Sequence, residues 1–147
     1  MKIRCIANKC EDLLEETILL IGYTKNYEFD IEIGTEHIVY GIFSTDGRSS
    51  YLLTDKHNFP FWYPAELFEI IDSLLPPTTR ISFKKYKRYD DKDSTATIIG
   101  YKEMTLDFDH HDDLIELKRE ALEIFYKRKA EIDEFEELRT SSAKANK

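Results

Sequence analysis

The chain has 147 residues, 41% of them hydrophobic and 13% aromatic, a composition typical of a folded globular protein rather than a disordered one. Its formal net charge is −8, so repulsion from phosphates argues against general nucleic-acid binding, whereas a basic protein would be attracted. The length predicts a single domain over 1–139, followed by a flexible polar tail over 140–147.

The start of the sequence predicts a cytoplasmic protein. The segment MKIRCIANK lacks the apolar run of a signal peptide, and no segment reaches the roughly 18 apolar residues that a membrane helix needs. Cys5 and Cys10 do not have the two-residue spacing of zinc or redox pairs, and two thiols without a secretion signal fit a reducing compartment. We therefore expect a cytoplasmic location and no membrane contact.

Short strands and tight turns dominate residues 1–107. The pair Asp46-Gly47 favours a hairpin turn, and Pro64 should end a strand and begin a single helical turn. The segment 10–22 fits a helical turn that runs into an apolar segment, and periodicity does not decide its type. Strands are expected at 2–7, 36–43, 51–55, 59–63, 68–72, 80–89 and 95–107, with a loop over 74–79 and turns at 56–58 and 90–94.

A long helix is expected over 112–139, because apolar residues recur there at helical spacing. Asp113 and Glu116 have the spacing of a capping box, which predicts the start of this helix. The predicted fold class is α+β: a small antiparallel β-barrel with a C-terminal helix packed on it.

Four segments resemble a family of small bacterial proteins: IGTEHIVYGI, DGRSSYLLTD, FPFWYPAELFEIID and IIGYKEMTLD, within 33–138. The middle part is similar to an SH3-like barrel, with Gly34, Gly47 and Pro64 at the positions that such a barrel requires. The resemblance implies a partly open SH3-like barrel to which 80–107 adds strands. It implies no activity, although many small acidic bacterial proteins of this kind are immunity proteins or inhibitors.

The aromatic stretch 59–72 has two interpretations. It is a surface groove that receives a polyproline ligand, as in SH3 domains, or it is a buried corner of the barrel. Alternation along a strand places Phe61 and Tyr63 on one face and Trp62 on the other. Trp62 and Tyr63 carry polar groups that are common at interfaces, so both are candidate partner-binding residues.

The segment DFDHHDD, 107–113, also has two interpretations. His110, His111 and the carboxylates around them have the chemistry of a metal site, but adjacent histidines rarely point at one ion, and a solvated helix start with an anionic cap explains them better. We therefore expect no metal and no other cofactor. The basic segment FKKYKRY, 83–89, fits an edge strand protected by lysines better than a nucleic-acid site.

The acidic residues support a hypothesis about the partner, because opposite charges speed the encounter of two proteins. The candidate binding residues where the last strand meets the helix are Asp107, Asp109, Asp112, Asp113 and Glu116. A second acidic patch is expected near the helix end, at Glu131, Asp133, Glu134, Glu136 and Glu137.

No catalytic motif is present, so the function hypotheses concern binding. The first is an immunity protein or inhibitor that occludes a basic toxin or nuclease. The second is an SH3-like adaptor that docks a peptide or protein through Trp62 and Tyr63. An enzyme of unknown type is the third. The sequence does not predict the oligomeric state.

Overall fold

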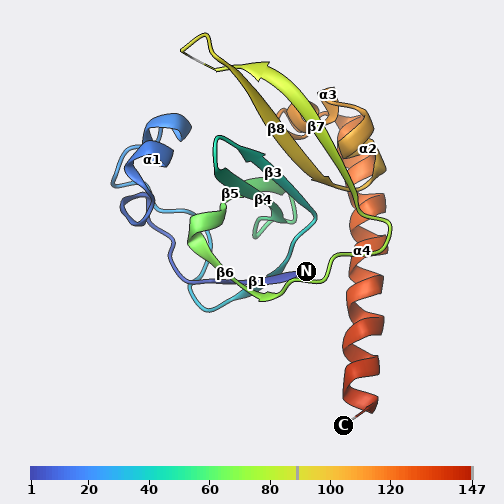
Figure 1. Ribbon diagram of the computed structural model, residues 1–147. Helices are drawn as coiled ribbons and strands as arrows, with labels where there is room; N and C mark the ends of the chain where they lie inside the picture. The colour runs from blue at the N-terminus through green and yellow to red at the C-terminus, as the bar shows by residue number, and fades with distance from the viewer. Residues whose placement is uncertain (89, 147) are drawn as a thin grey trace.

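The computed structural model describes residues 1–88 and 90–146, and it has an α+β fold with antiparallel sheets and a C-terminal helix, as predicted (Figure 1). The strands are β1 Lys2–Cys5, β2 Glu36–Ile38, β3 Gly41–Thr45, β4 Arg48–Thr54, β5 Pro60–Pro64, β6 Phe68–Asp72, β7 Arg80–Lys87 and β8 Asp93–Gly100. The helices are α1 Glu15–Ile21, α2 Lys102–Leu106, α3 Asp109–Ile115 and α4 Arg119–Ala145, with single 3-10 turns η1 Cys10–Asp12 and η2 Ala65–Leu67.

The strands form two sheets, one with the order β2-β1-β6 and one with the order β5-β4-β3-β8-β7. Only Val39 and Tyr40 separate β2 from β3, so one bent segment passes from the small sheet to the large one. Asp46 and Gly47 both have positive φ, 51° and 76°, and form the predicted two-residue hairpin turn between β3 and β4. Pro64 ends β5 and leads into η2, also as predicted.

The large sheet is the middle layer between two hydrophobic cores. Leu53 and Tyr63 face β1, β6 and the N-terminal arm, whereas Leu52 and Trp62 face α2, α3 and α4. Successive residues of a strand point to opposite faces, so neighbours in the sequence enter different cores. As predicted, Phe61 and Tyr63 share one face and Trp62 lies on the other. Figure 1 shows α4 along one side of the molecule and α1 on the opposite side.

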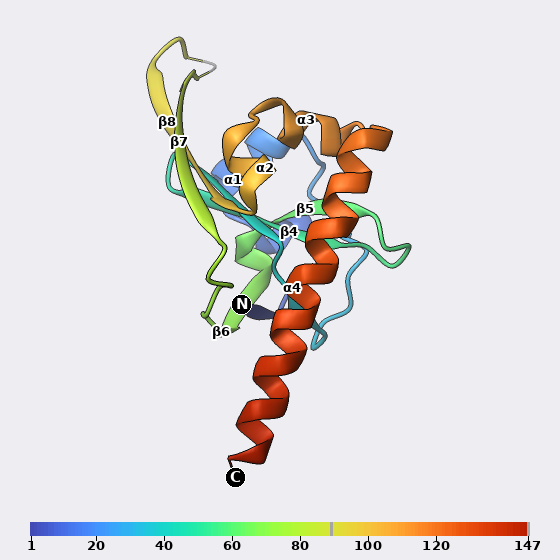
Figure 2. The same cartoon turned by 90° about the vertical axis from the view of Figure 1, so that its right-hand side faces the viewer.

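The C-terminal third differs from the prediction in three places. The last strand ends at Gly100 instead of residue 107, and 102–106 is the helix α2. The single helix expected over 112–139 is two helices, α3 and α4, separated by a turn in which Leu117 has φ 54°. The segment predicted as a tail is helical through Ala145, and the end of α4 extends beyond the body (Figure 2); Lys147 lies outside the described residues.

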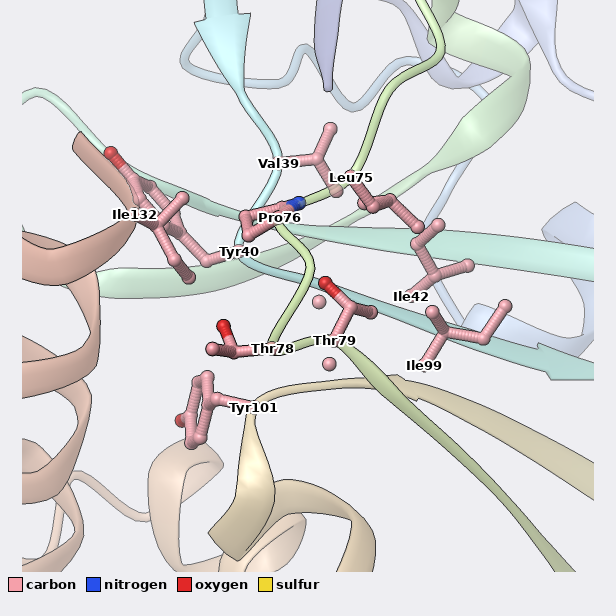
Figure 3. Close-up of a pocket in the computed structure, with 12 residues that line it drawn as sticks. Val39, Tyr40, Ile42, Leu75, Pro76, Thr78, Thr79, Ile99, Tyr101 and Ile132 are labelled. Carbon is pink, nitrogen blue, oxygen red and sulfur yellow. The ribbon is translucent and has the colours of Figure 1, made fainter. Parts of the chain in front are cut away.

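A small cavity lies where the loop before β7 crosses β3, β8 and α4 (Figure 3). Its floor is the pair Gly41 and Gly100, which stand opposite each other on β3 and β8. A Cβ atom on either glycine would lie 2.6 or 2.7 Å from the Met104 sulfur, so the absence of side chains lets α2 approach the sheet. The remaining space is about that of one water molecule, too small for a ligand.

Candidate functional site

The predicted acidic residues lie on and around α3, the second of two short helices that follow β8. The Asp107 carboxylate links the helices by accepting the backbone N–H of Asp109 at 3.1 Å. Asp112 has a side chain that is 77% exposed, and its carboxylate is 3.2 Å from Nδ1 of His111. Within 1–88 and 90–146, no lysine or arginine pairs with Asp109 or Asp112. These carboxylates are therefore open to a partner.

Asp113 does not have the predicted role. It lies inside α3, whose N-cap residue is Phe108 with no side-chain cap, so the capping box with Glu116 is not formed. Its carboxylate instead accepts the Lys118 ammonium at 2.6 Å, and Lys118 also reaches Glu116 at 3.1 Å. These two carboxylates raise the pKa of Lys118. The Asp113 side chain thus holds the turn between α3 and α4, while Glu116 remains exposed.

Tyr63 is not a surface residue, which corrects its prediction as a partner-binding residue. It is 2% exposed and lies in the core between the sheets, where its ring is 4.7 Å from the ring of Phe61. Burial is the main cause that raises its pKa to about 12, with a smaller contribution from Asp55. Trp62, on the other face, is partly exposed and is the aromatic residue of this stretch that remains a candidate.

Trp62 belongs to an aromatic cluster that α3 completes. The His111 ring lies 4.9 Å from the ring of Trp62 on β5 and 4.6 Å from the ring of Phe43 on β3. Phe43 and Trp62 also contact each other edge to face, with centroids 6.2 Å apart. The sequence did not indicate this cluster, because its members come from 43, 62 and 111 and meet only through the packing of α3 on the sheet.

An open groove of about 480 Å³ begins at this cluster. Its floor is Phe43 and Trp62 on the large sheet. One wall is His111 and Ile115 of α3, and the other is the N-terminal arm, through Ile21 at the end of α1 and residues beyond it. The lining is mainly apolar side chains from three separate parts of the chain.

The net charge of the protein is concentrated in the two segments that wall the groove. Segment 11–28, the arm, has five carboxylates and one lysine, and segment 107–118 has the same balance. These segments hold ten of the 29 acidic and two of the 21 basic residues, which leaves nineteen of each elsewhere. These two segments therefore carry a formal charge of −8, and the rest of the chain sums to zero, although the residues that line the groove itself include no carboxylate.

The second acidic patch, on α4, is only partly a surface. Glu136 is 1% exposed and binds the N-terminal ammonium of Met1 and the guanidinium of Arg139. Asp133 accepts the Tyr40 hydroxyl at 2.7 Å and pairs with Lys129. Two of the five predicted residues thus attach α4 to the body instead of facing a partner.

His110 is also structural. It is 2% exposed, and its Nε2 lies 2.6 Å from the Tyr101 hydroxyl. Burial lowers the pKa of His110, which favours the neutral ring. Among the described residues, no three His, Cys, Asp or Glu side chains gather as metal ligands would. His110 and His111 face different surroundings, a buried tyrosine and an open aromatic cluster.

The basic strand β7 is an edge strand of the large sheet, as predicted, with Tyr89 outside the described residues. Its hairpin with β8 is attached to the β3–β4 turn by Asp46, which accepts the Tyr86 and Ser94 hydroxyls at 2.8 and 2.7 Å. Lys84 lies 5.1 Å from the centre of the Phe108 ring. Tyr86 and Lys84 thus have contacts within the protein, so part of the basic and aromatic character of the strand is explained without a nucleic-acid ligand.

The pair Glu103 and Arg128 connects α2 to α4. Arg128 donates to both carboxylate oxygens of Glu103, at 2.6 and 2.8 Å. This pairing is the main cause that lowers the pKa of Glu103 to about 2, from an ordinary value of 4.5. Because the pKa of Glu103 is lower in the folded state, the ion pair stabilises the protein at pH values above the ordinary pKa. This stabilisation is lost as the pH falls toward the pKa of the folded state.

We expect Glu103→Gln to lower the free energy of unfolding by about 1–2 kcal/mol at pH 7, discounted for a side chain that is 28% exposed. The difference from the parent protein should shrink between about pH 4.5 and pH 2, where Glu103 becomes protonated. Urea denaturation at several pH values measures it, with Glu134→Gln on the exposed face of α4 as the control. A difference that does not change with pH would contradict an ionic origin.

Comparison of the chain with protein-family models, with curated proteins and with solved structures finds no match. The resemblance to a bacterial family therefore stays a prediction. No helix in the described part of the chain combines the length and the apolar character needed to cross a membrane.

Proposed function

We propose that this chain is a non-enzymatic cytoplasmic protein that binds a basic protein, a toxin or nuclease, and occludes it as an immunity protein or inhibitor. The observation that carries the proposal is the concentration of the net charge in the two segments, 11–28 and 107–118, that contribute side chains to an apolar groove. Exposed carboxylates such as Asp112 attract a basic partner over a distance, and the aromatic floor offers apolar contact once it arrives.

The two connected sheets favour this proposal, because they hold the strands of the groove in place. We propose that β1 to β6 form a partly open SH3-like barrel, because the bent β2–β3 segment and the β5–η2–β6 segment both connect the two sheets. The additional hairpin β7–β8 contacts α2, which contacts α3, and α3 packs on β5 of the proposed barrel.

A second candidate function is an adaptor that docks a peptide through Trp62. The specific observation in its favour is that Trp62 is only partly buried and lies on the groove floor. Tyr63 takes no part in this version, because it is in the core. The two candidate functions differ in their dependence on charge. An inhibitor of a basic protein uses the carboxylates, whereas docking of a polyproline ligand uses the aromatic rings and needs no charge.

We expect the gene of this chain to lie beside one that encodes a toxin or nuclease domain, and the test produces that domain with and without the chain. We expect the chain to restore growth, and we expect association to slow at least ten-fold as salt rises from 0.05 to 0.5 M, because the attraction is screened. Asp112→Lys should slow association about five-fold. Glu134→Lys changes the net charge equally but lies outside the walls, so we expect less than a two-fold effect.

Failure to bind or neutralise this domain would contradict the inhibitor hypothesis. Binding that is indifferent to salt and to Asp112→Lys would remove its electrostatic basis and favour the adaptor.

A further inference from the structure

We propose that the groove between the arm and α3 receives a lysine- and arginine-rich segment of the partner that inserts a large apolar side chain as its anchor. The inference rests on the proposed function and specifies the part of the partner that is recognised.

The apolar surface of the groove requires the anchor. Ile115 is 60% exposed and Tyr23 is 36% exposed, and both line the groove together with Trp62. An inserted Phe or Leu side chain would remove all three from water at once, which a purely polar segment cannot do. Because Trp62 and Phe43 are held by β5, β3 and the His111 ring, the floor exists before the partner binds.

The charge of the walls requires basic residues on both sides of the anchor. Each of the two segments has five carboxylates and one lysine, and the lysine of segment 107–118, Lys118, is already paired with Asp113 and Glu116. Glu15 at the start of α1 and Asp112 on α3 are exposed, and no lysine or arginine of the described residues pairs with either of them, whereas Glu16 lies 3.7 Å from Arg48. Lysine and arginine stems can cover the apolar rim while their charged ends reach these carboxylates.

The same charges exclude other occupants. An acidic segment and the phosphates of a nucleic acid would both be repelled by the two walls. A guanidinium also stacks favourably on a tyrosine or tryptophan ring, so Tyr23 and Trp62 add to the preference for arginine.

Trp62 is the only tryptophan in the chain, so its fluorescence reports directly on the groove floor. The probe is a tryptophan-free 12-residue peptide of Lys, Arg and Ala with a central Phe-Leu pair. Three comparison peptides carry Ala-Ala in place of the pair, Glu in place of every Lys and Arg, or a polyproline sequence. We expect the first peptide to change Trp62 emission and to bind at least ten-fold more tightly than any other.

The matched variants are Ile115→Ala, which shortens an exposed side chain of the groove wall, and Leu138→Ala, which shortens one on α4 that is 64% exposed. Neither residue is in a core, so both variants should fold. Ile115→Ala should weaken the Phe-Leu peptide about three- to ten-fold, and Leu138→Ala should leave its affinity unchanged. Equal binding of the Phe-Leu and Ala-Ala peptides, tighter binding of the polyproline peptide, or no effect of Ile115→Ala would overturn the inference.

These results separate the inference from the proposed function. If the peptide binds as expected but the neighbouring toxin domain is not neutralised, the groove is confirmed and the inhibitor hypothesis is wrong. If the toxin domain is neutralised but the Phe-Leu pair makes no difference, the inhibitor acts through another surface and the inference is wrong.

Discussion

Phe125→Ala should lower the free energy of unfolding by about 3–5 kcal/mol, the usual cost of emptying a phenylalanine site in a core. Phe125 is fully buried where α4 meets the large sheet. Its ring contacts the Tyr40 ring edge to face, with the centroids 5.7 Å apart. Truncation removes this contact and leaves a cavity that the neighbouring strand and helix cannot fill without moving.

Chemical denaturation of both proteins measures this loss. Leu138→Ala is the control, because Leu138 lies on the same helix but is exposed, and its loss should cost less than about 0.5 kcal/mol. A cost below about 1 kcal/mol for Phe125→Ala would mean that α4 is not packed on the sheet in solution.

Glu136→Ala should also cost about 3–5 kcal/mol, because it breaks a buried ionic network by removing one member. The Glu136 carboxylate accepts the Met1 ammonium at 2.5 Å and the Arg139 guanidinium at 2.7 Å, and Arg139 continues to Asp72 at 2.6 Å. Without Glu136, the buried ammonium has lost its counter-ion. The network links the start of β1, the end of β6 and α4, so its loss weakens contacts between distant parts of the chain.

Two further variants identify the origin of this effect. Glu136→Gln keeps a hydrogen-bond acceptor but removes the charge, so we expect a loss between those of the parent and Glu136→Ala. Glu137→Ala, at the next, exposed position, should cost less than about 0.5 kcal/mol. Equal small losses for Glu136→Ala and Glu137→Ala in urea denaturation would show that the network contributes nothing.

The sequence predicted local structure well where one or two residues decide the backbone. Asp46 and Gly47 specify a turn with positive φ, and Pro64 fixes the end of β5, so the hairpin and the strand–turn–strand segment are confirmed. The predicted end of the last strand was wrong, because the apolar pattern after Gly100 fits a strand as well as a short helix. What favours the helix is a tertiary contact, the approach of Met104 to Gly41 and Gly100.

The candidate site was less predictable, because it depends on which face of each strand is covered. Alternation places Trp62 and Tyr63 on opposite faces, but both faces of this sheet are packed, and the sequence alone does not tell which residue keeps some exposure. Glu136 is likewise indistinguishable from its acidic neighbours until the positions of Met1 and Arg139 are known. The position of His111 over Phe43 and Trp62 requires the packing of α3 on the sheet.

The two acidic segments, 11–28 and 107–118, are far apart in the sequence, and only the fold brings them to one groove. The most direct measurement is the affinity of the basic Phe-Leu peptide for Asp112→Lys and Glu134→Lys, titrated side by side through Trp62 fluorescence. Both substitutions change the net charge of the chain equally, and both positions are exposed. We predict about five- to ten-fold weaker binding for Asp112→Lys and less than a two-fold change for Glu134→Lys. Equal weakening by the two variants would show that only the total charge matters, and would contradict a binding site between the acidic walls.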